Sequence, residues 1–429
     1  MSSRSADGVR KLLVLDTSYT LEMVRQRGLE APILCRDLDG FFEHVWSVHP
    51  FATLLTSEEW GPRFGKPASY EIAPRHTVIE GKVGRFAALR KLFAINFLLS
   101  QVGLFLALRR LVRAEGISVI RAGSPLYLGL FGWALARSCG IPLVIRVGGN
   151  FDKTFEATGV PLEPRLMRSR RVEKVVERFI FPRADLVAGA NQDNLDFALA
   201  NGARPERSTL FRYGNLIDER HLTEPAGRPK SEDVLAAMGV RPLEFLLYIG
   251  RLEPVKQPDH VIETLAEVRR RGFDVKAVLA GDGRMRSELA DQARALGIEG
   301  ATVFAGNIDQ DRLAELIPVA AVVVSPHTGR ALAEAALGAA PIVAYDIDWQ
   351  GELIEDGVTG LLVPHGDQGR MAEGVVRLLS DREEARRLGN ALRQRALTML
   401  DPAKLDEHER QEYRKLLARF AARYRRAPL

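Results

Sequence analysis

Cysteine is scarce in this chain, which has only two among its 429 residues. Cys35 and Cys139 both lie in apolar surroundings, and a disulfide framework needs more cysteines in a secreted context. The histidines are scattered, and no cluster of Asp, His or Cys shows the spacing of metal ligands. The scarcity excludes a disulfide-stapled secreted domain and predicts a protein of the reducing cytoplasm with no metal site.

Long apolar segments are also lacking. The residues before the first predicted strand contain no apolar core of signal-peptide length, so we expect no export signal. The longest uncharged run, residues 92–108, contains Asn96, Ser100 and Gln101, which makes it too short and too polar for a membrane span. With 46% hydrophobic and 27% charged residues, the chain is typical of soluble globular proteins and long enough for two domains.

The charge is positive and unevenly distributed. The formal net charge is +5 and the pI is about 9.2, and basic residues interleave with leucine and phenylalanine in 90–96, 109–113 and 165–183. This pattern favours peripheral association with an anionic membrane, although solvated faces of ordinary helices have the same composition. No stacking aromatics or recognition motif accompany the charge, so we expect no nucleic-acid partner.

Continuous apolar runs of strand length recur in both halves and alternate with helical segments. In the first half they lie at 11–16, 31–37, 118–123, 142–149, 185–190 and 209–215. In the second half they lie at 245–251, 275–283, 301–307, 320–326, 340–346 and 359–367. Uninterrupted apolar runs indicate strands covered on both faces, so each half is predicted to be an α/β, Rossmann-like domain with a doubly wound parallel sheet.

The polar, proline-containing stretch 218–234 is the predicted linker between an N-terminal domain at 1–218 and a C-terminal domain at 235–400. After it the chain becomes helical and highly charged, and 401–429 is predicted to be a helix that packs back on the N-terminal domain. Residues 50–90 contain four prolines and few strong periods. We predict a long excursion there and assign it no chemistry.

Two cations follow the first strand of the second half. The motif GRLEPVK (250–256) places Arg251 and Lys256 five residues apart, after a turn at Gly250. A fork-shaped guanidinium and a point-like ammonium together suit the neighbouring phosphates of a diphosphate. The motif therefore predicts a diphosphate site, with plain turn geometry as the alternative explanation of its glycine.

The next two strand ends also carry glycine. In AGDGR (280–284), glycines flank Asp282 and allow the backbone to approach a ligand or a neighbouring helix closely. AGN (305–307) ends in Asn307 and is followed by Ile308. Main-chain groups at this edge are suited to a nucleobase, although a strand-to-helix turn explains each glycine equally well.

A fourth strand end, SPHTGRALAE (325–334), joins strand to helix through a glycine turn. The start of that helix offers free N–H groups to a phosphate. The residues concerned are Thr328, Gly329, Arg330 and Ala331. Further along the helix, the Glu334 carboxylate is placed to accept hydrogen bonds from vicinal sugar hydroxyls. The alternative is an Arg330–Glu334 ion pair on a solvated face.

As an ordered set, these motifs and DWQGELIEDGVTGLLV (348–363) resemble the donor-binding half of the retaining nucleotide-sugar glycosyltransferases of glycosyltransferase family 4. The resemblance implies the GT-B fold, in which two Rossmann-like domains face each other across a cleft and C-terminal helices cross back. It implies that Arg251 and Lys256 stabilise the donor diphosphate. It also implies that Glu334, at the end of the family's E-x7-E signature, binds the nucleotide ribose.

The same resemblance assigns the remaining donor contacts. Phosphate falls on the turn before Glu334, and the base falls near Asn307 and Ile308. The first glutamate of the signature is replaced by Pro326, and we expect His327 and Arg330 to take over its contact with the transferred sugar.

The first half resembles the family more loosely, through SVIRAGSP, IPLVIRVGGN, ADLVAGANQ and FRYGNLID. It lacks the glycine-rich loop after the first strand, and it has RVGGN at 146–150 where many relatives have a histidine. Asp16, Asn150 and Asp152 stand at or beyond strand ends and are the predicted acceptor-binding residues, with capping of the next turn or helix as the alternative.

These features predict a retaining, metal-independent glycosyltransferase that needs no cofactor. It would move a sugar from a nucleotide-diphosphate sugar to a glycan or lipid-linked acceptor in bacterial surface or capsular polysaccharide synthesis, in the cytoplasm or at the inner face of the cell membrane. One alternative is a nucleotide-sugar 2-epimerase of the same fold. The other is a non-catalytic nucleotide-sugar or glycan-binding protein that supports a partner transferase.

Overall fold

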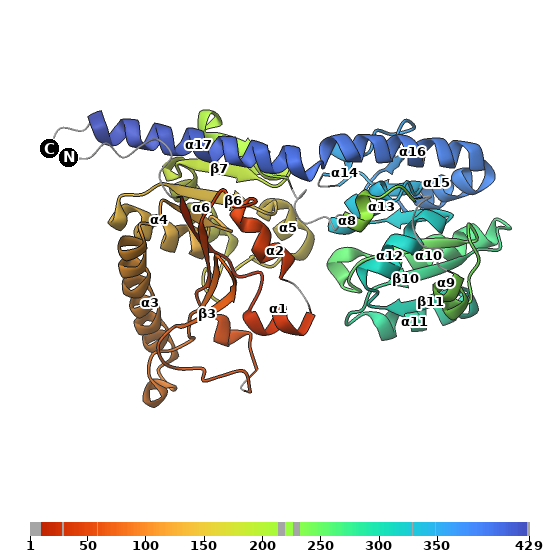
Figure 1. The fold of residues 1–429 in the computed structure, drawn as a ribbon. Coiled ribbons are helices and arrows are strands. Elements are labelled where there is room, and N and C mark those ends of the chain that lie inside the picture. Colours follow the sequence, from red (N-terminus) through yellow and green to blue (C-terminus); the bar gives the residue numbers. More distant parts are fainter. Residues whose placement is uncertain are drawn as a thin grey trace. The chain divides into compact units, whose positions relative to one another are not determined.

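The computed structural model describes residues 10–27, 30–57, 59–212, 219–225, 232–327, 329–347 and 349–426. The chain forms two compact units (Figure 1). Unit 1 consists of Met1–Leu216 with Ala403–Leu429, and unit 2 of Ile217–Pro402. Each unit is an α/β domain with its own sheet, as the sequence predicts.

In its described part, unit 1 has an eight-stranded sheet in the order β3-β4-β2-β1-β5-β6-β7-β8. The strands are β1 (Lys11–Leu15), β2 (His44–His49), β3 (Ala68–Ala73), β4 (His76–Glu80), β5 (Val119–Ala122), β6 (Leu143–Val147), β7 (Leu186–Gly189) and β8 (Ser208–Leu210). Leu13 of β1 lies opposite Trp46 of β2 and Ile120 of β5. All pairs are parallel except β3 with β4, which is antiparallel at the sheet edge.

Helices cover both faces of this sheet (Figure 1). They are α1 (Leu21–Arg27), α2 (Ala31–Leu34), α3 (Phe93–Glu115), α4 (Tyr127–Cys139), α5 (Phe151–Thr158), α6 (Arg170–Ile180), α7 (Gln192–Ala200) and α17 (Pro402–Arg426). Short 3-10 turns lie at Cys35–Asp37, Ala52–Leu54, Ala87–Leu89, Phe181–Arg183 and Pro205–Arg207. The C-terminal helix α17 thus returns to unit 1.

The alternation of side chains along β1 separates two cores. Leu13 and Leu15 pack with buried residues of α3 and α4, whereas Leu12 and Val14 pack with Tyr413 of α17 on the opposite face. Both faces are apolar because successive strand residues point to opposite sides of a sheet that is covered twice. The continuous apolar runs of the sequence have this cause.

Two sequence expectations for this unit are corrected. The strand predicted at 31–37 is wrong, since these residues form α2 and the 3-10 turn Cys35–Asp37. Pro32 occupies the first turn of α2, where its missing N–H removes no intrahelical bond, while a central strand would need that donor. The excursion predicted at 50–90 contains β3 and β4. The prolines at 62, 67 and 74 lie outside both strands, so they leave the pairing of the two strands intact.

Unit 2 has, in its described residues, a six-stranded parallel sheet in the order β11-β10-β9-β12-β13-β14. The strands are β9 (Phe245–Ile249), β10 (Lys276–Ala280), β11 (Thr302–Gly306), β12 (Val322–Ser325), β13 (Ile342–Tyr345) and β14 (Leu361–Val363). The helices are α8 (Glu219–Leu222), α9 (Glu232–Met238), α10 (Pro258–Arg270), α11 (Arg286–Ala295), α12 (Gln310–Leu316), α13 (Arg330–Leu337), α14 (Gln350–Leu353), α15 (Gln368–Ser380) and α16 (Arg382–Met399), with 3-10 turns at Pro254–Lys256, Glu299–Ala301 and Ile317–Val319.

Each sheet grows first to one side of its first strand and then to the other. In unit 1 the change falls between β1 and β5, and in unit 2 between β9 and β12. The loops after two such strands diverge to opposite faces and leave a crevice at the carboxyl ends of the strands, where open α/β sheets bind ligands. The topology therefore marks one candidate site in each unit.

Candidate active site

In unit 2, the loops after β9 and β12 bring two predicted residues together. Lys256 Nζ lies 3.0 Å from His327 Nδ1. A Cβ atom placed on Gly329 would lie 3.7 Å from the same Nζ, so the ammonium stands beside the N-terminus of α13. Among the described residues, the N-cap Gly329 supplies no side-chain cap, and uncapped N–H groups at a helix start are suited to an anionic ligand. A cation and a helix tip thus meet at the switch point, as an anion site requires.

The contact between Lys256 and His327 also sets the form of the imidazole. An ammonium group has donors only, so Nδ1 of His327 must be the acceptor in the 3.0 Å contact. A neutral imidazole that accepts at Nδ1 carries its proton on Nε2. His327 is therefore a neutral hydrogen-bond donor at Nε2 rather than a second cation.

Arg251 lies in the loop that follows β9, and its residue is exposed. Its backbone oxygen accepts a hydrogen bond from the Tyr248 hydroxyl at 3.0 Å. Within the residues that the structure describes, no ion-pair partner of the guanidinium is present. Its charge is thus available to a ligand.

Two glycines of the β10 loop hold the Arg251 loop in place. A Cβ on Gly281, whose φ is +154°, would lie 1.9 Å from the Gly250 oxygen, and a Cβ on Gly283 would lie 2.4 Å from the Leu252 oxygen. Any larger residue at either position would clash with backbone that cannot move aside. The two loops pack backbone against backbone because both positions are glycine.

Glu334 is buried, with 2% of its surface exposed. Its Oε1 atom pairs with Arg330 Nε at 2.7 Å and, with the Gln310 amide in its satisfying orientation, accepts from that amide at 3.2 Å. The ion pair that the sequence left as an alternative is therefore formed, but not on a solvated face. These contacts fall on Oε1 and hold the carboxylate in place.

The remaining predicted donor residues lie at the same carboxyl edge of the sheet. Asp282 is exposed, and its Oδ1 accepts from the Gly283 N–H at 2.8 Å. Asn307 is exposed after β11, and Ile308 is half-buried against the core. Ala331 is half-buried in the first turn of α13, and Thr328 lies outside the described residues. None of these placements tests a donor contact, so all of them stay predictions.

The switch point of unit 1 carries a cavity of about 190 Å³. Its walls come from the ends of β1, β5 and β6 and from the segment around Pro32. The lining residues are Val14, Asp16, Ser18, Tyr19, Pro32, Cys35, Arg36, Arg121, Gly123, Arg146 and Gly148. Of the three predicted acceptor residues, only Asp16 is among them.

Ion pairs organise this cavity. The Arg36 guanidinium pairs with Asp16 and donates to Ser47 Oγ at 2.8 Å. Burial alone would raise the pKa of Asp16, but Arg36 and the Ser18 hydrogen bonds outweigh it and hold that pKa below its ordinary value. Asp16 is therefore an ionised acceptor of hydrogen bonds at the cavity wall.

A second pair reaches the cavity from the C-terminal helix. Arg121 Nη1 donates to Glu409 Oε1 of α17 at 3.0 Å, and Arg146 Nη1 lies 3.8 Å from Glu409 Oε2. Both partners of the first pair are nearly enclosed, with side-chain exposures of 7% and 4%. The helix thus fixes two arginines of the cavity by one buried carboxylate.

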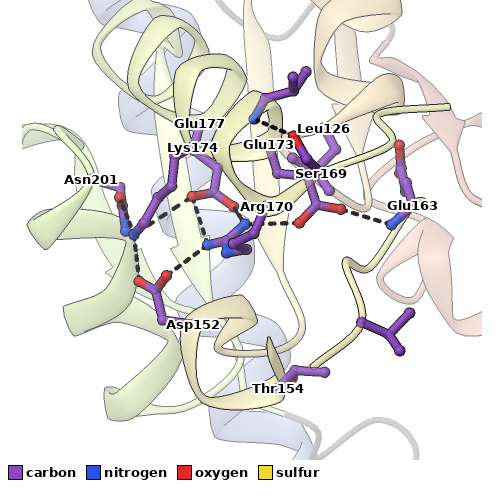
Figure 2. Close-up of polar contacts among 12 residues, drawn as sticks. Leu126, Asp152, Thr154, Glu163, Ser169, Arg170, Glu173, Lys174, Glu177 and Asn201 are labelled. Carbon is purple, nitrogen blue, oxygen red and sulfur yellow. Dashed lines mark hydrogen bonds and ion pairs between the residues drawn. The ribbon is translucent and has the colours of Figure 1, made fainter. Parts of the chain in front are cut away.

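Asn150 and Asp152 serve the local structure instead. Asn150 Oδ1 accepts from the N–H groups of Asp152 and Lys153 at 3.2 Å and caps α5, which is the alternative that the sequence left open. Asp152 pairs with Arg170 at 2.9 Å and with Lys174 at 2.5 Å (Figure 2). Neither residue lines the cavity of unit 1.

Sequence reasoning missed Arg36, Arg121, Arg146 and Glu409. A signal for two of them was present, since SVIRAG and PLVIRVGG each carry one arginine inside an otherwise apolar strand. A charge in a buried strand is rarely placed there without a partner or a ligand. No local signal could have found Glu409, which lies 288 residues from Arg121 along the chain.

Metal ligands do not gather in the parts of the chain that the structure describes. Among those residues, no group of three or more His, Cys, Asp or Glu side chains is placed to hold a metal ion. His260 instead contacts the Tyr345 hydroxyl at 2.9 Å, and His365 contacts Gln257 at 3.1 Å. The expectation of metal-independent chemistry stays a prediction.

Both halves of the chain match known sequence families. Residues 18–214 match the family described as "Glycosyl transferase 4-like domain", and residues 241–395 match the family described as "Glycosyl transferases group 1". The candidate site of unit 2 lies inside the second match, and most of the cavity of unit 1 lies inside the first.

Two curated relatives align with parts of the chain. Alpha-D-kanosaminyltransferase of Streptomyces kanamyceticus is 35% identical over 148 residues, which are 34% of this chain and 38% of that protein. Glycogen synthase of Mycobacterium tuberculosis is 34% identical over 237 residues, 54% of each chain. The chain therefore spans about half or less of the length of these relatives.

Solved structures agree in fold along nearly the whole chain. Anabaena HepE in complex with UDP and glucose has a TM-score of 0.69 at 19% identity, covering 94% of this chain and 98% of its own. Sucrose-phosphate synthase of Thermosynechococcus elongatus has a TM-score of 0.69 at 20% identity, covering 95% and 99%. At such identities the likeness shows the fold alone, and that fold is GT-B.

Proposed function

Because the chain belongs to the group 1 glycosyl transferases, we propose that it is a retaining glycosyltransferase that moves a sugar from a nucleotide-diphosphate sugar to a hydroxyl of a glycan or lipid-linked acceptor. The observation that carries this proposal is the 3.0 Å contact of Lys256 with His327 beside the uncapped N-terminus of α13. It supplies a cation and oriented N–H groups at the place where a diphosphate departs. HepE, which shares the fold, binds UDP and glucose.

The residues of unit 2 divide the donor between them. Lys256 and Arg251 bind the diphosphate, with the N–H groups at the start of α13 around one phosphate. The Glu334 carboxylate, held by Arg330 at 2.7 Å, accepts hydrogen bonds from the ribose hydroxyls. Main-chain groups at Asn307 and Ile308 meet the base, and the loop of Gly250 and Asp282 closes the site.

The reaction breaks the bond between the anomeric carbon and the diphosphate oxygen. The acceptor oxygen forms its new bond to the same carbon on the same face, and its proton passes to the departing diphosphate. Charge develops on the leaving oxygens, so fixed cations there stabilise the transition state more than the ground state. His327 donates from Nε2 to a hydroxyl of the transferred sugar, which orients the ring.

The two basic side chains would do the work that a divalent ion does in other transferases. A guanidinium and an ammonium neutralise a diphosphate without a metal, because both are permanent donors at neutral pH. We therefore propose metal-independent transfer with no further cofactor. Turnover unchanged by a chelator supports this, and restoration of lost turnover by Mg²⁺ or Mn²⁺ contradicts it.

In unit 1, the cavity beside Asp16 is the proposed acceptor site. An ionised carboxylate orients an acceptor hydroxyl, and the arginines of the wall donate to its other oxygens. The proposed setting is bacterial surface or capsular polysaccharide synthesis in the cytoplasm. Two free cysteines, Cys35 and Cys139, support a reducing compartment.

A second candidate function follows from one difference between this chain and the family signature. Pro326 stands where the family signature has a glutamate, and a chain without that group could bind the nucleotide sugar and support a partner transferase without turnover. Calorimetry with UDP-, GDP- and ADP-sugars, followed by nucleotide-release assays, separates the two. Binding without release across a broad acceptor panel favours the second function.

The decisive test of the first function is the product. A donor screen by nucleotide release identifies the nucleotide sugar, and NMR of the product gives the configuration of the new bond. Retention of the donor configuration supports the proposal. Inversion, or conversion of the donor sugar without any acceptor, contradicts it.

A further inference from the structure

The outer face of α3 is apolar throughout its first four turns. Its large side chains are exposed to between 39% and 62%. They are Leu92 at its N-terminal end, Phe93, Ile95, Leu98, Leu99, Val102 and Leu106, and Phe86 is exposed nearby. Soluble proteins expose single apolar residues commonly, but a contiguous set of this kind marks an interaction surface.

The inner face of the same turns holds three buried polar residues, followed by the core residue Leu104. Asn96, Ser100 and Gln101 are 1%, 4% and 7% exposed. Each makes hydrogen bonds with unit 1, which satisfies the buried polar groups. The first turns of α3 therefore hold amides and a hydroxyl inside and most of their large apolar side chains outside, while Leu104 and Leu108 join the core.

These hydrogen bonds determine which face points outward. Asn96 accepts from the N–H groups of Arg85 and Phe86 at 2.7 and 2.9 Å and donates to the Phe86 oxygen at 2.8 Å. Ser100 donates to the Lys82 oxygen at 2.7 Å, and Gln101 accepts from the Tyr127 hydroxyl at 2.7 Å. A rotation that buried the leucines would break every one of these bonds.

The charge around this face has one sign. Residues 81–114 contain no Asp or Glu. Lys82 is buried, with 5% of its surface exposed. The other basic residues lie before and after the apolar stretch, at Arg85, Arg90, Lys91, Arg109, Arg110 and Arg113. An apolar face bordered by cations at both ends is complementary to a bilayer that carries anionic headgroups.

We propose that the face formed by Leu92, Phe93, Ile95, Leu98, Leu99, Val102 and Leu106 docks onto the surface of a bilayer that contains anionic lipid. The leucines enter the boundary between headgroups and acyl chains, and the bordering cations bind lipid phosphates. A second copy of the chain is a poorer occupant, because pairing two such faces brings two acid-free basic segments together.

The helix docks along the surface rather than crossing the bilayer. The sequence expectation that the run at 92–108 is too short and too polar to span is corrected, because all of that run except Leu92 lies within the 23-residue helix α3. By length and composition α3 is long and apolar enough to span, and it is the one helix in the described residues that is. A third of its most apolar window is buried in unit 1, however, and the bonds of Asn96, Ser100 and Gln101 attach it there. Spanning would place those three polar groups in hydrocarbon without their partners.

The inference concerns unit 1 alone and does not depend on the donor chemistry of unit 2. If the acceptor is lipid-linked, docking would bring the transferase to the surface that carries it. Vesicle binding is measured without donor or acceptor, so its failure leaves the proposed transfer standing, and failure of transfer leaves docking standing.

The test is flotation of the full chain with vesicles of phosphatidylcholine alone or with about one third phosphatidylglycerol, at about 50 and about 150 mM salt. The wild type is expected to float with the anionic vesicles and to remain largely unbound with the neutral ones. Binding is expected to weaken, but not vanish, at the higher salt, because the apolar part is not screened.

Two double variants divide the contributions. Ile95→Gln with Leu98→Gln is expected to lower the partition by at least about tenfold, and both positions are exposed, so folding should survive. Arg90→Gln with Lys91→Gln is expected to abolish the preference for anionic vesicles. The matched control, Leu243→Gln with Leu296→Gln, changes two leucines of unit 2 that are 50% and 45% exposed, and should bind like the wild type.

Each remaining outcome decides against the proposal. Absence of vesicle binding by the folded wild type overturns it. Equal loss in the control variant shows that general hydrophobicity, and not this face, causes the binding. If the wild type is a dimer in solution, the Ile95/Leu98 variant is a monomer and neither binds vesicles, the face joins two copies instead.

Discussion

The two switch points of this chain present their charges in opposite ways. In unit 2, Arg251 is exposed and Lys256 stands at an uncapped helix tip beside His327. In unit 1, Arg36 and Arg121 are nearly enclosed and paired with Asp16 and Glu409. The guanidinium of Arg251 is exposed at the first site, whereas the second site uses most of its positive charge to fix its own walls.

The difference matches what each site would bind. A diphosphate is common to all nucleotide-diphosphate sugars, and cations with backbone N–H groups recognise it without regard to the rest of the molecule. An acceptor varies, and a walled cavity with fixed polar groups selects among shapes. The contrast predicts that substitutions in unit 1 act on stability and selectivity, and substitutions in unit 2 on turnover.

The largest expected effect is on stability in unit 1. Glu409→Gln leaves Arg121 enclosed without its ion-pair partner. Arg146, which lies farther from Glu409, loses the same partner. Breaking a buried pair from one side should lower the free energy of unfolding by about 3 kcal/mol, measured by urea denaturation. The control is Glu407→Gln on the same helix. Glu407 pairs with Arg410 and Arg414 at the protein surface, so this variant should change the unfolding free energy little.

An equal loss in both variants would mean that the Glu409 pair is no stronger than a surface pair. The charges of unit 1 would then be as open as those of unit 2, and the comparison would fail.

The next effect is on turnover in unit 2. Lys256→Ala removes the cation at the tip of α13 and should lower kcat by about a hundredfold, roughly 2.7 kcal/mol, with little change in unfolding. Arg294→Ala, an exposed arginine of unit 2 paired only with Asp291 in the described structure, is the matched control in the nucleotide-release assay. A loss below about tenfold in folded Lys256→Ala would separate this lysine from the departing diphosphate.

The fold was predictable because the repeated apolar runs are a local signal of buried parallel strands. The predicted pair of doubly wound sheets and the helical C-terminus are confirmed. The strand predicted at 31–37 was wrong, because a short apolar segment fits a helix and a strand equally well. Only Pro32 favours the helix. The edge strands β3 and β4 escaped because the prolines around them hide their short alternating pattern.

The two sites also differ in how far the sequence predicts them, because one is built from local motifs and the other from contacts between distant segments. The residues of unit 2 follow strand ends in order, with glycines that mark each turn, so sequence motifs find them. The walls of the unit 1 cavity come from the ends of β1, β5 and β6 and from the segment around Pro32. The Arg121–Glu409 contact that ties one wall to α17 joins residues 288 positions apart. Such a pair is created by tertiary packing, and no spacing in the sequence encodes it.

A smaller effect distinguishes the two interpretations of Glu334. Its carboxylate is held by Arg330 through Oε1, and the proposed role of the group is to bind the ribose. Glu334→Ala should weaken binding of the donor nucleotide by about tenfold, or 1.4 kcal/mol, in calorimetry. Glu288→Ala, at an exposed position of α11, should bind like the wild type. If Glu334→Ala also binds normally, the Arg330 pair is the whole role of this glutamate.

The smallest effect lies in the polar network of unit 1 around Arg170 (Figure 2). Burial raises the pKa of Glu163 to about 7. Between about pH 4.5 and 7, the folded chain therefore binds one more proton at this carboxyl than the unfolded chain does. That contribution to stability is present at the acid end and lost as pH rises through 7.

Glu163→Gln keeps an acceptor for the Tyr127 N–H, which lies 3.2 Å from Oε2, and removes the titration. Between pH 5.5 and 8, the urea stability of the wild type should therefore fall by about 1 kcal/mol more than that of the variant. His49, whose burial lowers its pKa to about 4, acts in the opposite direction but equally in both chains, so the difference between them isolates Glu163. Parallel pH profiles would show that this carboxyl is ionised in the folded chain and that the network around Arg170 tolerates its charge.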